Sequence, residues 1–198
     1  LVREIGEYLA VARGLLLFTL DRGQLAMVAT DGKRLALATM SVEGGASEQR
    51  IVIPAKTLDV LADQAGNAIE VTISAHHLSF SVGGRLIVSR TIDGIFPKYE
   101  RIIPRENDKV IVIERSALIA ALRRVRVASE ENGAIYFSIA SGAMELSSTS
   151  AEVGTANEPL SIEYDGTPLK ICINGDYVLD FLNAASGQTV TMALKDAM

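Results

Sequence analysis

Apolar residues follow one pattern three times along this chain. The triplet IVI at residues 51–53 returns as IVI at 111–113 and as ICI at 171–173, at intervals of 60 residues. Each triplet precedes a segment with apolar residues every three or four positions, typical of an amphipathic helix, and then an alternating segment typical of a strand. The sequence therefore predicts a strand–helix–strand unit repeated three times.

The predicted helices are placed by their apolar stripes, which we expect to face a sheet. Ser116 and Asn174 have side chains that favour a helix N-cap, so the second and third helices are expected to begin there. A further helix is expected in residues 1–12. The three stripes are Leu58, Leu61, Ala62 and Ala65; Leu118, Ala121, Leu122 and Val125; and Tyr177, Val178, Phe181, Leu182 and Ala185.

The segments between the helices alternate between apolar and polar residues. IEVTIS, LSFSV and RLIVSR each have a period of two, and glycine-containing turns separate successive segments, at Gly83 and Gly84 and at Gly142. This pattern predicts antiparallel hairpins and an α+β fold in which helices cover one face of predominantly antiparallel sheets. The charged, proline-containing stretch IIPRENDK is the expected domain boundary, giving domains at residues 1–104 and 105–198.

Composition sets limits on the class of protein. The chain has 198 residues, 48% hydrophobic and 22% charged, which excludes a disordered or collagen-like chain. No apolar run approaches the roughly 18 residues that span a bilayer, and the first residues do not resemble a targeting segment. The only cysteine, Cys172, allows no internal disulfide. We therefore expect a soluble cytoplasmic protein that does not enter a membrane.

The net charge of −5 argues against a uniformly basic nucleic-acid binder, but it describes only an average. Arg123 lies opposite the apolar stripe of the second predicted helix, with Arg115 and Arg126 beside it, whereas the third helix has Asp176 and Asp180 on the corresponding side. Two interpretations of the basic face remain open. It is either an ordinary solvated surface or a surface that faces phosphates.

The residues offer no constellation for catalysis. His76 and His77 fall in a predicted hairpin turn, and neighbouring residues on a strand point to opposite faces, so a shared metal is not expected. The sequence has no P-loop, no dinucleotide-binding glycine motif and no nucleophile motif. We expect no enzyme activity, no catalytic residues, no metal and no cofactor.

Two segments are poorly explained by structure alone. Residues 29–36 (ATDGKRLA) place two cations directly after an Asp-Gly turn. Residues 93–104 (DGIFPKYERIIP) form a connector that is more apolar than a surface linker. The connector either packs against a sheet or lines an interaction groove.

These two segments resemble a known family. ATDGKRLA is similar to the ATDGHRLA signature of the bacterial replicative sliding clamp, the β subunit of DNA polymerase III, and DGIFPKYERIIP resembles that family's DGRFPDYRRVLP segment. The similar segments occur in the family's order and cover nearly the whole chain. Further similar segments are IVIPAKTLDVL at 51–61, SSTSAEVGTANEPL at 147–160 and INGDYVLDFLNA at 173–184.

The resemblance implies a DNA-clamp fold in which helices line the hole of a ring and antiparallel sheets lie outside. It implies a processivity factor that encircles duplex DNA without reading its sequence. Its implied partners are DNA polymerase III, other proteins with a clamp-binding motif, the clamp loader and a second subunit of a homodimer. The chain would correspond to most of the middle and C-terminal domains, without the first domain, the last strands and the C-terminal tail.

The resemblance also implies site residues. Lys56 matches a position that faces the hole, and Arg123 is added to it on helical periodicity. Val127 and Ala128 match the position where the third domain meets the neighbouring subunit. Lys33 replaces a histidine of the signature, which adds a positive charge to the rim of a partner-peptide pocket. The implied pocket residues are Thr30, Gly32, Lys33, Arg34, Leu35, Pro97, Arg101, Ile102, Asn174, Tyr177 and Met198.

Two alternatives from other classes stay open at this point. The same duplicated α+β scaffold could support a small-molecule enzyme, in which case a deep pocket should hold converging titratable groups. It could also be a non-replicative dimerisation scaffold of the same fold. A clamp should instead have a shallow apolar groove near Thr30, Pro97 and Tyr177.

Overall fold

The computed structural model describes residues 15–43, 48–62 and 68–195. The chain divides into two compact units, Leu1–Lys98 and Tyr99–Met198, and each unit is described by itself. The division falls inside the apolar connector, a few residues before the boundary expected at 104 and 105. The helix expected in residues 1–12 lies outside the described residues.

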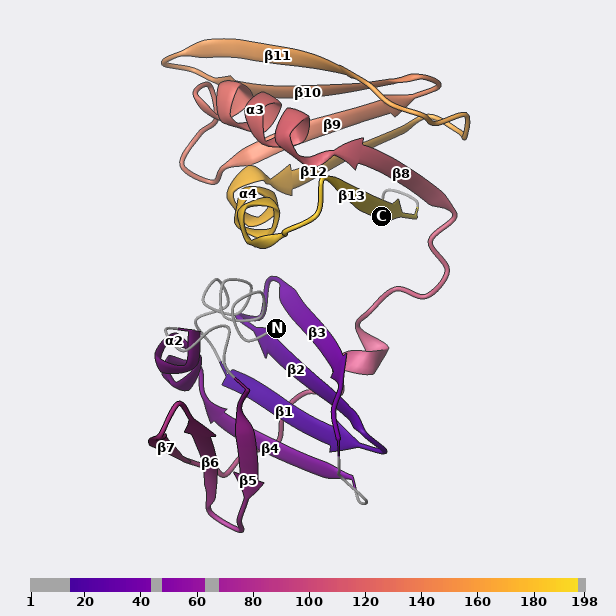
Figure 1. The fold of residues 1–198 in the computed structure, drawn as a ribbon. Coiled ribbons are helices and arrows are strands. Elements are labelled where there is room, and N and C mark those ends of the chain that lie inside the picture. Colours follow the sequence, from indigo (N-terminus) through magenta and orange to yellow (C-terminus); the bar gives the residue numbers. More distant parts are fainter. Residues whose placement is uncertain (1–14, 44–47, 63–67, 196–198) are drawn as a thin grey trace. The chain divides into compact units, whose positions relative to one another are not determined.

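The first unit contains a four-stranded antiparallel sheet (Figure 1). The strand order is β3-β2-β1-β4. Strand β1 pairs with both β2 and β4, so that Phe18 lies opposite Met27 on one side and Ile51 on the other. Core-facing apolar residues of β1 and β2 are almost fully buried. The strands are β1 (Leu15–Asp21), β2 (Gln24–Thr30), β3 (Leu35–Ser41) and β4 (Gln49–Pro54).

A short helix and a three-stranded meander complete the first unit. The helix α2 (Lys56–Ala62) follows β4, and the meander has the order β5-β6-β7. Its strands are β5 (Glu70–Ile73), β6 (His77–Val82) and β7 (Arg85–Arg90). The hydroxyls of Thr57 on α2 and Ser89 on β7 are buried and lie 2.8 Å apart in a hydrogen bond, which joins the helix to the meander.

Glycines with positive φ make the predicted hairpin turns. Gly83 and Gly84 have φ of 55° and 75° between β6 and β7, values that L-residues with a side chain rarely adopt. Gly142 has φ of 74° between the two strands that follow the second repeat. Both predicted turns are therefore confirmed.

The second unit begins with a single 3₁₀ turn at Tyr99–Arg101, and its described residues then form two α-helices and two sheets. Its elements are β8 (Lys109–Glu114), α3 (Arg115–Arg126), β9 (Ala134–Ala140), β10 (Ala143–Ser150), β11 (Gly154–Ser161), β12 (Leu169–Asn174), α4 (Gly175–Ala184) and β13 (Thr189–Leu194). The three predicted strand–helix–strand units therefore start at β4, β8 and β12, as expected.

The two repeats of the second unit exchange their first strands. β12, which starts one repeat, pairs with β9 of the other repeat in the sheet β11-β10-β9-β12. β8, which starts the other repeat, pairs with β13. All of these pairings are antiparallel. The repeats therefore cannot fold as separate subdomains, because each supplies an edge of the other's sheet.

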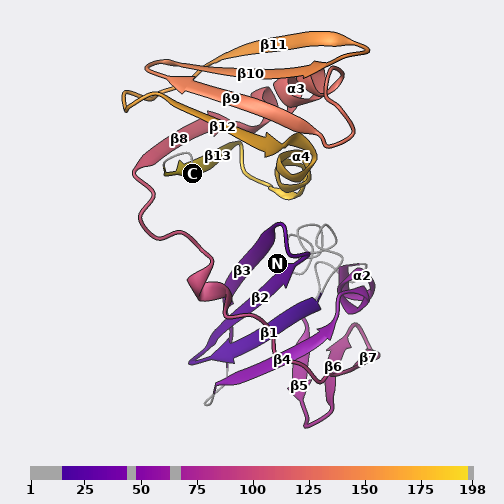
Figure 2. The ribbon, with the colours of Figure 1, turned by 180° about the vertical axis from the view of Figure 1, so that it is seen from behind.

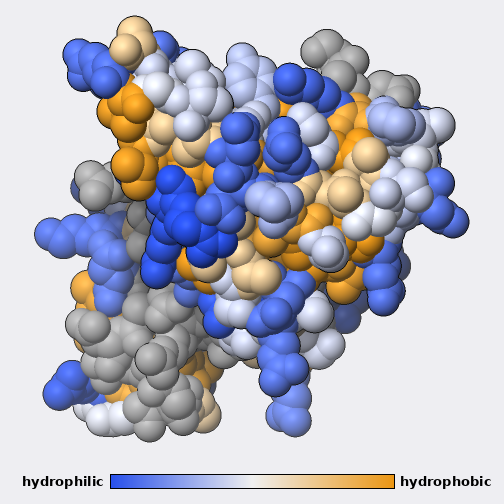
Figure 3. Space-filling model, turned by 90° about the horizontal axis from the view of Figure 1, so that it is seen from above, coloured by the Kyte–Doolittle hydropathy of each residue, from blue (hydrophilic) through white to orange (hydrophobic). Residues whose placement is uncertain are grey.

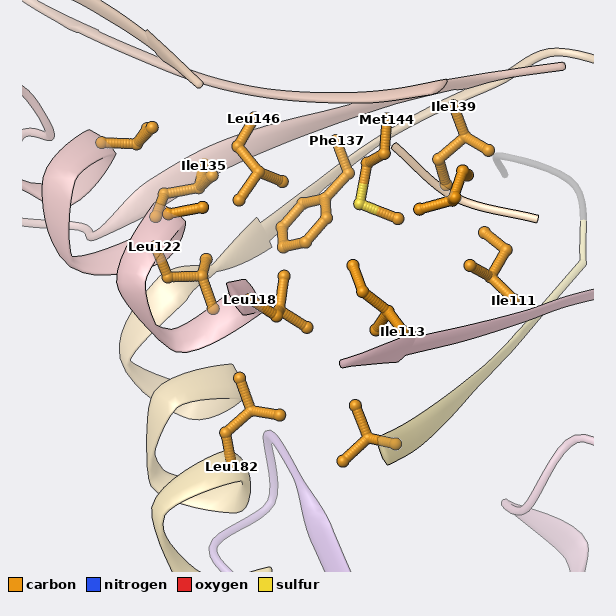
Figure 4. Packing of buried hydrophobic residues seen from close by; sticks show 14 of the residues in the cluster. Ile111, Ile113, Leu118, Leu122, Ile135, Phe137, Ile139, Met144, Leu146 and Leu182 are labelled. Carbon is orange, nitrogen blue, oxygen red and sulfur yellow. The ribbon is translucent and has the colours of Figure 1, made fainter. Parts of the chain in front are cut away.

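Helix α3 packs on the four-stranded sheet of the second unit, as seen from both sides in Figures 1 and 2. Figure 4 shows Phe137 and Leu146 of the sheet pointing toward Leu118 and Leu122 of the helix. All four side chains are completely buried. The whole predicted stripe of this helix, which includes Ala121 and Val125, is buried as expected.

Two expectations for the helices are wrong. Phe181, predicted for the buried stripe of the third helix, is 45% exposed, and Leu179 is buried in its place together with Leu182. Leu179 and Phe181 are two positions apart and so point to different sides of α4, and the side that carries Leu179 and Leu182 faces the core. Ser116 is not an N-cap: α3 begins at Arg115 after Glu114, and the Ser116 hydroxyl bonds the Glu114 carboxylate instead.

Candidate functional site

The loop between β2 and β3 is locked by its own side chains. The hydroxyl of Thr30 donates to the carbonyl of Arg34 over 2.7 Å and accepts from the backbone N–H of Gly32 over 3.1 Å. Gly32 has φ of 84°, which an L side chain would strain. These bonds give the segment one well-defined conformation, so the side chains that it presents are fixed in space.

Asp31 is the centre of this loop. One carboxylate oxygen accepts the backbone N–H groups of Lys33 and Arg34 at 2.9 and 3.0 Å, and the other accepts Nε of Arg34 at 3.0 Å. Partial burial raises the pKa of Asp31, but the bonds from Lys33 and Arg34 and the Arg34 charge outweigh it and hold the pKa below 3.8. Asp31 is therefore ionised at neutral pH and neutralises Arg34.

Lys33 is the next residue and has a different environment. Its side chain is exposed, and within the described residues it has neither a hydrogen bond nor an ion pair. Leu35, at the start of β3, is half-buried. The loop therefore presents an uncompensated cation beside an apolar strand start.

The connector at residues 93–104 has both buried and exposed apolar residues. Phe96 is buried, whereas Ile95 and Ile102 are 98% and 61% exposed. Pro97 and Arg101 are exposed as well. Packing therefore accounts for Phe96, and the interaction groove stays a prediction for the exposed residues.

The first turn of α4 is anchored to the turn before β9. Asn174 accepts the N–H of Asp176 over 2.9 Å, which confirms it as the N-cap, and its amide donates to the carbonyl of Asn132 over 2.8 Å. Gly133 has φ of 65°, and a Cβ there would lie 3.0 Å from the Asn174 side chain. The backbone N–H of Gly175 also donates to the Gly133 carbonyl, over 2.8 Å. This network fixes the start of the helix that presents Tyr177.

The cations of α3 have different partners. Arg124 forms a two-pronged ion pair with Glu158 of β11, and Arg126 forms one with Asp176 of α4. Arg115 donates to the carbonyls of Leu182 and Gly187 (2.8 and 2.9 Å). Arg123 is exposed, with no such partner in the described part of the chain. The basic face predicted for this helix is thus reduced to Arg123 by internal pairing.

Lys56 is exposed at the start of α2. Like Arg123, it forms no ion pair with any described residue. The residues after α2, where the helix was expected to continue, lie outside the described part of the chain. On the face of the molecule in Figure 3, hydrophilic and hydrophobic side chains are interspersed. Lys56 and Arg123 are therefore the two predicted DNA-facing cations that stay available to an external anion.

The end of α3 carries the predicted subunit interface. Val127 is 71% exposed, whereas Ala128 is only 3% exposed. The buried hydroxyl of Ser148 on β10 donates to the carbonyl of Val125 over 2.5 Å and holds this turn on the sheet. Val127 alone therefore offers apolar surface to a partner.

The predicted pocket residues belong to both units. Thr30, Gly32, Lys33, Arg34, Leu35 and Pro97 lie in the first unit, and Arg101, Ile102, Asn174 and Tyr177 lie in the second. Met198 lies outside the described residues. Asp31 holds Lys33 and Arg34 in the first unit, and Asn132 holds Asn174 in the second.

Sequence reasoning missed the residues that organise these sets. Asp31 was interpreted as a turn residue only, although an Asp followed two and three residues later by free N–H groups is a known loop-capping pattern. The Asn-Gly pair at Asn132 marks a turn locally, and its side chain accepts the N–H of Ala134, but its bond with Asn174 joins residues 42 positions apart. Glu158 likewise lies 34 residues from its partner Arg124, so neither long-range bond has a local signal.

An open hollow of about 610 Å³ lies at one end of the four-stranded sheet in the second unit. Ala140, Ala143, Glu145, Pro168 and Lys170 are among its lining residues. None of its lining residues belongs to the predicted pocket.

Among the described residues, no group of three or more His, Cys, Asp and Glu side chains is arranged to hold a metal ion. His76 lies in the turn before β6 and His77 is the first residue of that strand. Cys172 is an exposed free thiol. Within the described part of the chain, no helix has the length and apolar character needed to cross a membrane.

Sequence comparison matches the chain to two consecutive domains of one family. The family described as "DNA polymerase III beta subunit, central domain" matches residues 7–98, and "DNA polymerase III beta subunit, C-terminal domain" matches residues 100–198. The curated beta sliding clamp of Caulobacter vibrioides is 32% identical over 191 residues, which cover 92% of this chain and 51% of that protein. The chain spans about half the length of the curated relatives it matches.

Solved structures agree with the sequence comparison. A DNA polymerase sliding clamp from Pseudomonas aeruginosa, crystallised with a ligand, has a TM-score of 0.92 at 27% identity, covering 98% of this chain and 57% of that chain. Another sliding clamp structure from the same organism, bound to griselimycin, has a TM-score of 0.90 at 27% identity. The match covers 99% of this chain and 58% of that chain. The α+β clamp fold expected from the sequence is thereby confirmed.

Proposed function

Because the chain belongs to the DNA polymerase III beta subunit family, we propose that it forms part of a sliding clamp that encircles duplex DNA and tethers DNA polymerase III. One observation carries this proposal: profiles of two consecutive domains of that family match residues 7–98 and 100–198 in order. The clamp acts as a processivity factor in the cytoplasm and performs no catalysis. The matching relatives are named as clamps, not as enzymes or other scaffolds, which supports this function over the alternatives.

The DNA-facing part of the proposal needs only a few cations. Sliding requires weak attraction to phosphates, which is independent of base sequence. Lys56 and Arg123 are exposed and available for it. Asp176, an acid on the neighbouring helix, is neutralised by Arg126 and so repels DNA less than its formal charge indicates.

The partner-peptide pocket is proposed to use the residues that each unit holds in place. Leu35, Pro97 and Ile102 supply apolar surface for the Leu and Phe anchors of a short peptide. The polar side chains of Thr30 and Asn174 bond within their own units and hold the loop between β2 and β3 and the start of α4 in place. Gly32, Lys33, Arg34, Arg101, Tyr177 and Met198 complete the proposed pocket.

The subunit interface of a homodimer is proposed at the end of α3. Val127 is exposed there, and the buried Ala128 beside it keeps the turn close to the sheet. β11 is the edge strand of that sheet among the described residues, so its outer backbone groups are available for pairing. Together they offer a partner both apolar contact and hydrogen bonds.

The peptide pocket is tested by calorimetry on this chain with a short peptide that contains the Leu and Phe anchors. Arg101→Ala and Tyr177→Ala are expected to weaken binding by about tenfold each, because side chains at the centre of an interface carry much of its energy. Arg85→Ala and Tyr136→Ala are the matched controls, since both residues are exposed and lie outside the proposed pocket. Equal affinities for all five proteins would refute the pocket.

The ring is tested on DNA with a subunit of the relatives' full length that contains this chain. After incubation with the clamp loader, it should remain on nicked circular DNA and leave when the circle is linearised. Rapid loss from the circle itself would contradict the clamp and favour a non-replicative scaffold.

A further inference from the structure

We propose that Lys33 makes the partner-peptide pocket select peptides that carry a carboxylate beside their apolar anchors. This inference rests on the proposed function and adds the chemical class of the partner. It is carried by the distribution of charge in the loop between β2 and β3, which the first unit fixes on its own.

The loop contains three charged residues, and two of them neutralise each other. Asp31 bonds the guanidinium of Arg34 at 3.0 Å through one oxygen and two backbone N–H groups through the other. The lowered pKa of Asp31 keeps this pair ionised at neutral pH. The loop therefore has a net charge of +1, which Lys33 carries.

The ammonium of Lys33 is available to a partner. Its side chain is exposed, and the described residues supply no acid for it. Its backbone N–H is held by Asp31 at 2.9 Å, and the Thr30 hydroxyl bonds both sides of the turn. The cation therefore starts from a rigid base, which lowers the entropic cost of pairing with an external carboxylate.

The position of the cation determines what it can do. Lys33 lies two residues before Leu35, which is half-buried and belongs to the proposed apolar surface. A charge at the rim of an apolar site contributes to specificity and to the rate of association more than to total affinity. Because the chain as a whole has a net charge of −5, attraction of an acidic peptide depends on local cations such as Lys33.

The test uses calorimetry with paired peptides that contain the same Leu and Phe anchors and differ only in Asp against Asn, with the position of this residue moved along the peptide. At one position or more, the Asp peptide should bind about two- to fivefold more tightly than its Asn partner, as expected for an exposed ion pair. The preference should disappear in Lys33→Ala and reverse in Lys33→Glu. It should also weaken as salt is added.

Arg85→Ala is the matched control, because it removes an exposed cation from a hairpin of the same unit and changes the net charge equally. It should keep the Asp preference. No Asp preference at any position, with both peptides bound, would overturn this inference and leave the pocket standing. Failure of both peptides to bind would overturn the pocket and this inference with it.

Discussion

The guanidinium of Arg126, in the last turn of α3, bonds both carboxylate oxygens of Asp176, in the first turn of α4. The two residues are 50 positions apart in the chain. Their pairing raises the pKa of Arg126, because the hydrogen bond to Asp176 favours the charged guanidinium. It places the end of the helix that carries Val127 against the start of the helix that carries Tyr177. The proposed subunit interface and the proposed peptide pocket are thus joined by one ion pair inside the second unit.

This ion pair should have a small, measurable coupling energy. Arg126→Ala, Asp176→Ala and the double variant should give a coupling of about 0.5–1 kcal/mol in urea denaturation followed by circular dichroism, as found for exposed, well-oriented pairs. The same cycle with Arg123 in place of Arg126 is the control and should give no coupling, since no described residue forms an ion pair with Arg123. Equal couplings in both cycles would mean that the pair has no specific role.

Acid should destabilise the first unit in part through Asp31. Its pKa in the folded protein lies below the ordinary 3.8, so the unfolded chain takes up the proton first as the pH falls. The stability contributed by Asp31 is therefore complete above about pH 4 to 5 and is lost as the pH falls through the lowered pKa.

Asp31→Asn tests this dependence, because the amide oxygen can still accept the N–H groups of Lys33 and Arg34 while carrying no charge. Urea denaturation at a series of pH values should give a shallower acid limb for the variant than for the wild type. In the second unit, the hydrogen bond from Arg124 lowers the pKa of Glu158. Glu158→Gln should therefore also have a shallower acid limb than the wild type. Identical acid limbs would contradict the assignment.

A methyl group should not fit at Gly175. An added Cβ would lie 2.3 Å from Cδ1 of Ile135, and that side chain is completely buried and cannot move away freely. Gly175→Ala should lower the free energy of unfolding by about 1–3 kcal/mol, the usual cost of overpacking. Gly94→Ala is the control, since no atom lies within 4 Å of its added Cβ. Thermal or urea denaturation gives the free energy of unfolding of both variants, and an equal loss in the two would contradict the close contact at Gly175.

The proposed subunit interface predicts a change in assembly without a change in fold. Val127→Glu should alter the stability of this chain by less than about 0.5 kcal/mol, because the side chain is 71% exposed. In a subunit of the relatives' full length, it should weaken self-association by tenfold or more in sedimentation equilibrium, because a charge would be buried unpaired.

Leu86→Glu is the matched control for Val127→Glu, with a residue that is 70% exposed in the first unit. It should leave self-association unchanged. A dimer that tolerates Val127→Glu as well as it tolerates Leu86→Glu would place the interface elsewhere.

Local patterns in the sequence were sufficient for much of the architecture. The 60-residue recurrence located β4, β8 and β12, and the period of the following residues identified α3 and its complete buried stripe. The cap at Asn174 and the glycine turns were also readable, because each depends on a backbone requirement within a few residues. The stripe of α4 was misjudged because apolar residues lie on more than one side of this helix, and only the tertiary structure shows that the side with Leu179 is buried while Phe181 is exposed.

The sequence by itself determined the repeated units, the turn positions and the resemblance that led to the pocket residues, since these depend on local periodicity or on short strings of residues similar to those of the family. The tertiary structure alone decided that β8 and β12 exchange sheets, that Arg126 neutralises Asp176 and that Arg34 is paired while Lys33 has no ion pair among the described residues. The physical reason is that strand pairing and ion pairing depend on which distant groups meet in space. The sequence shows which charged residues the chain contains, and only the fold determines which of them remain available to a partner.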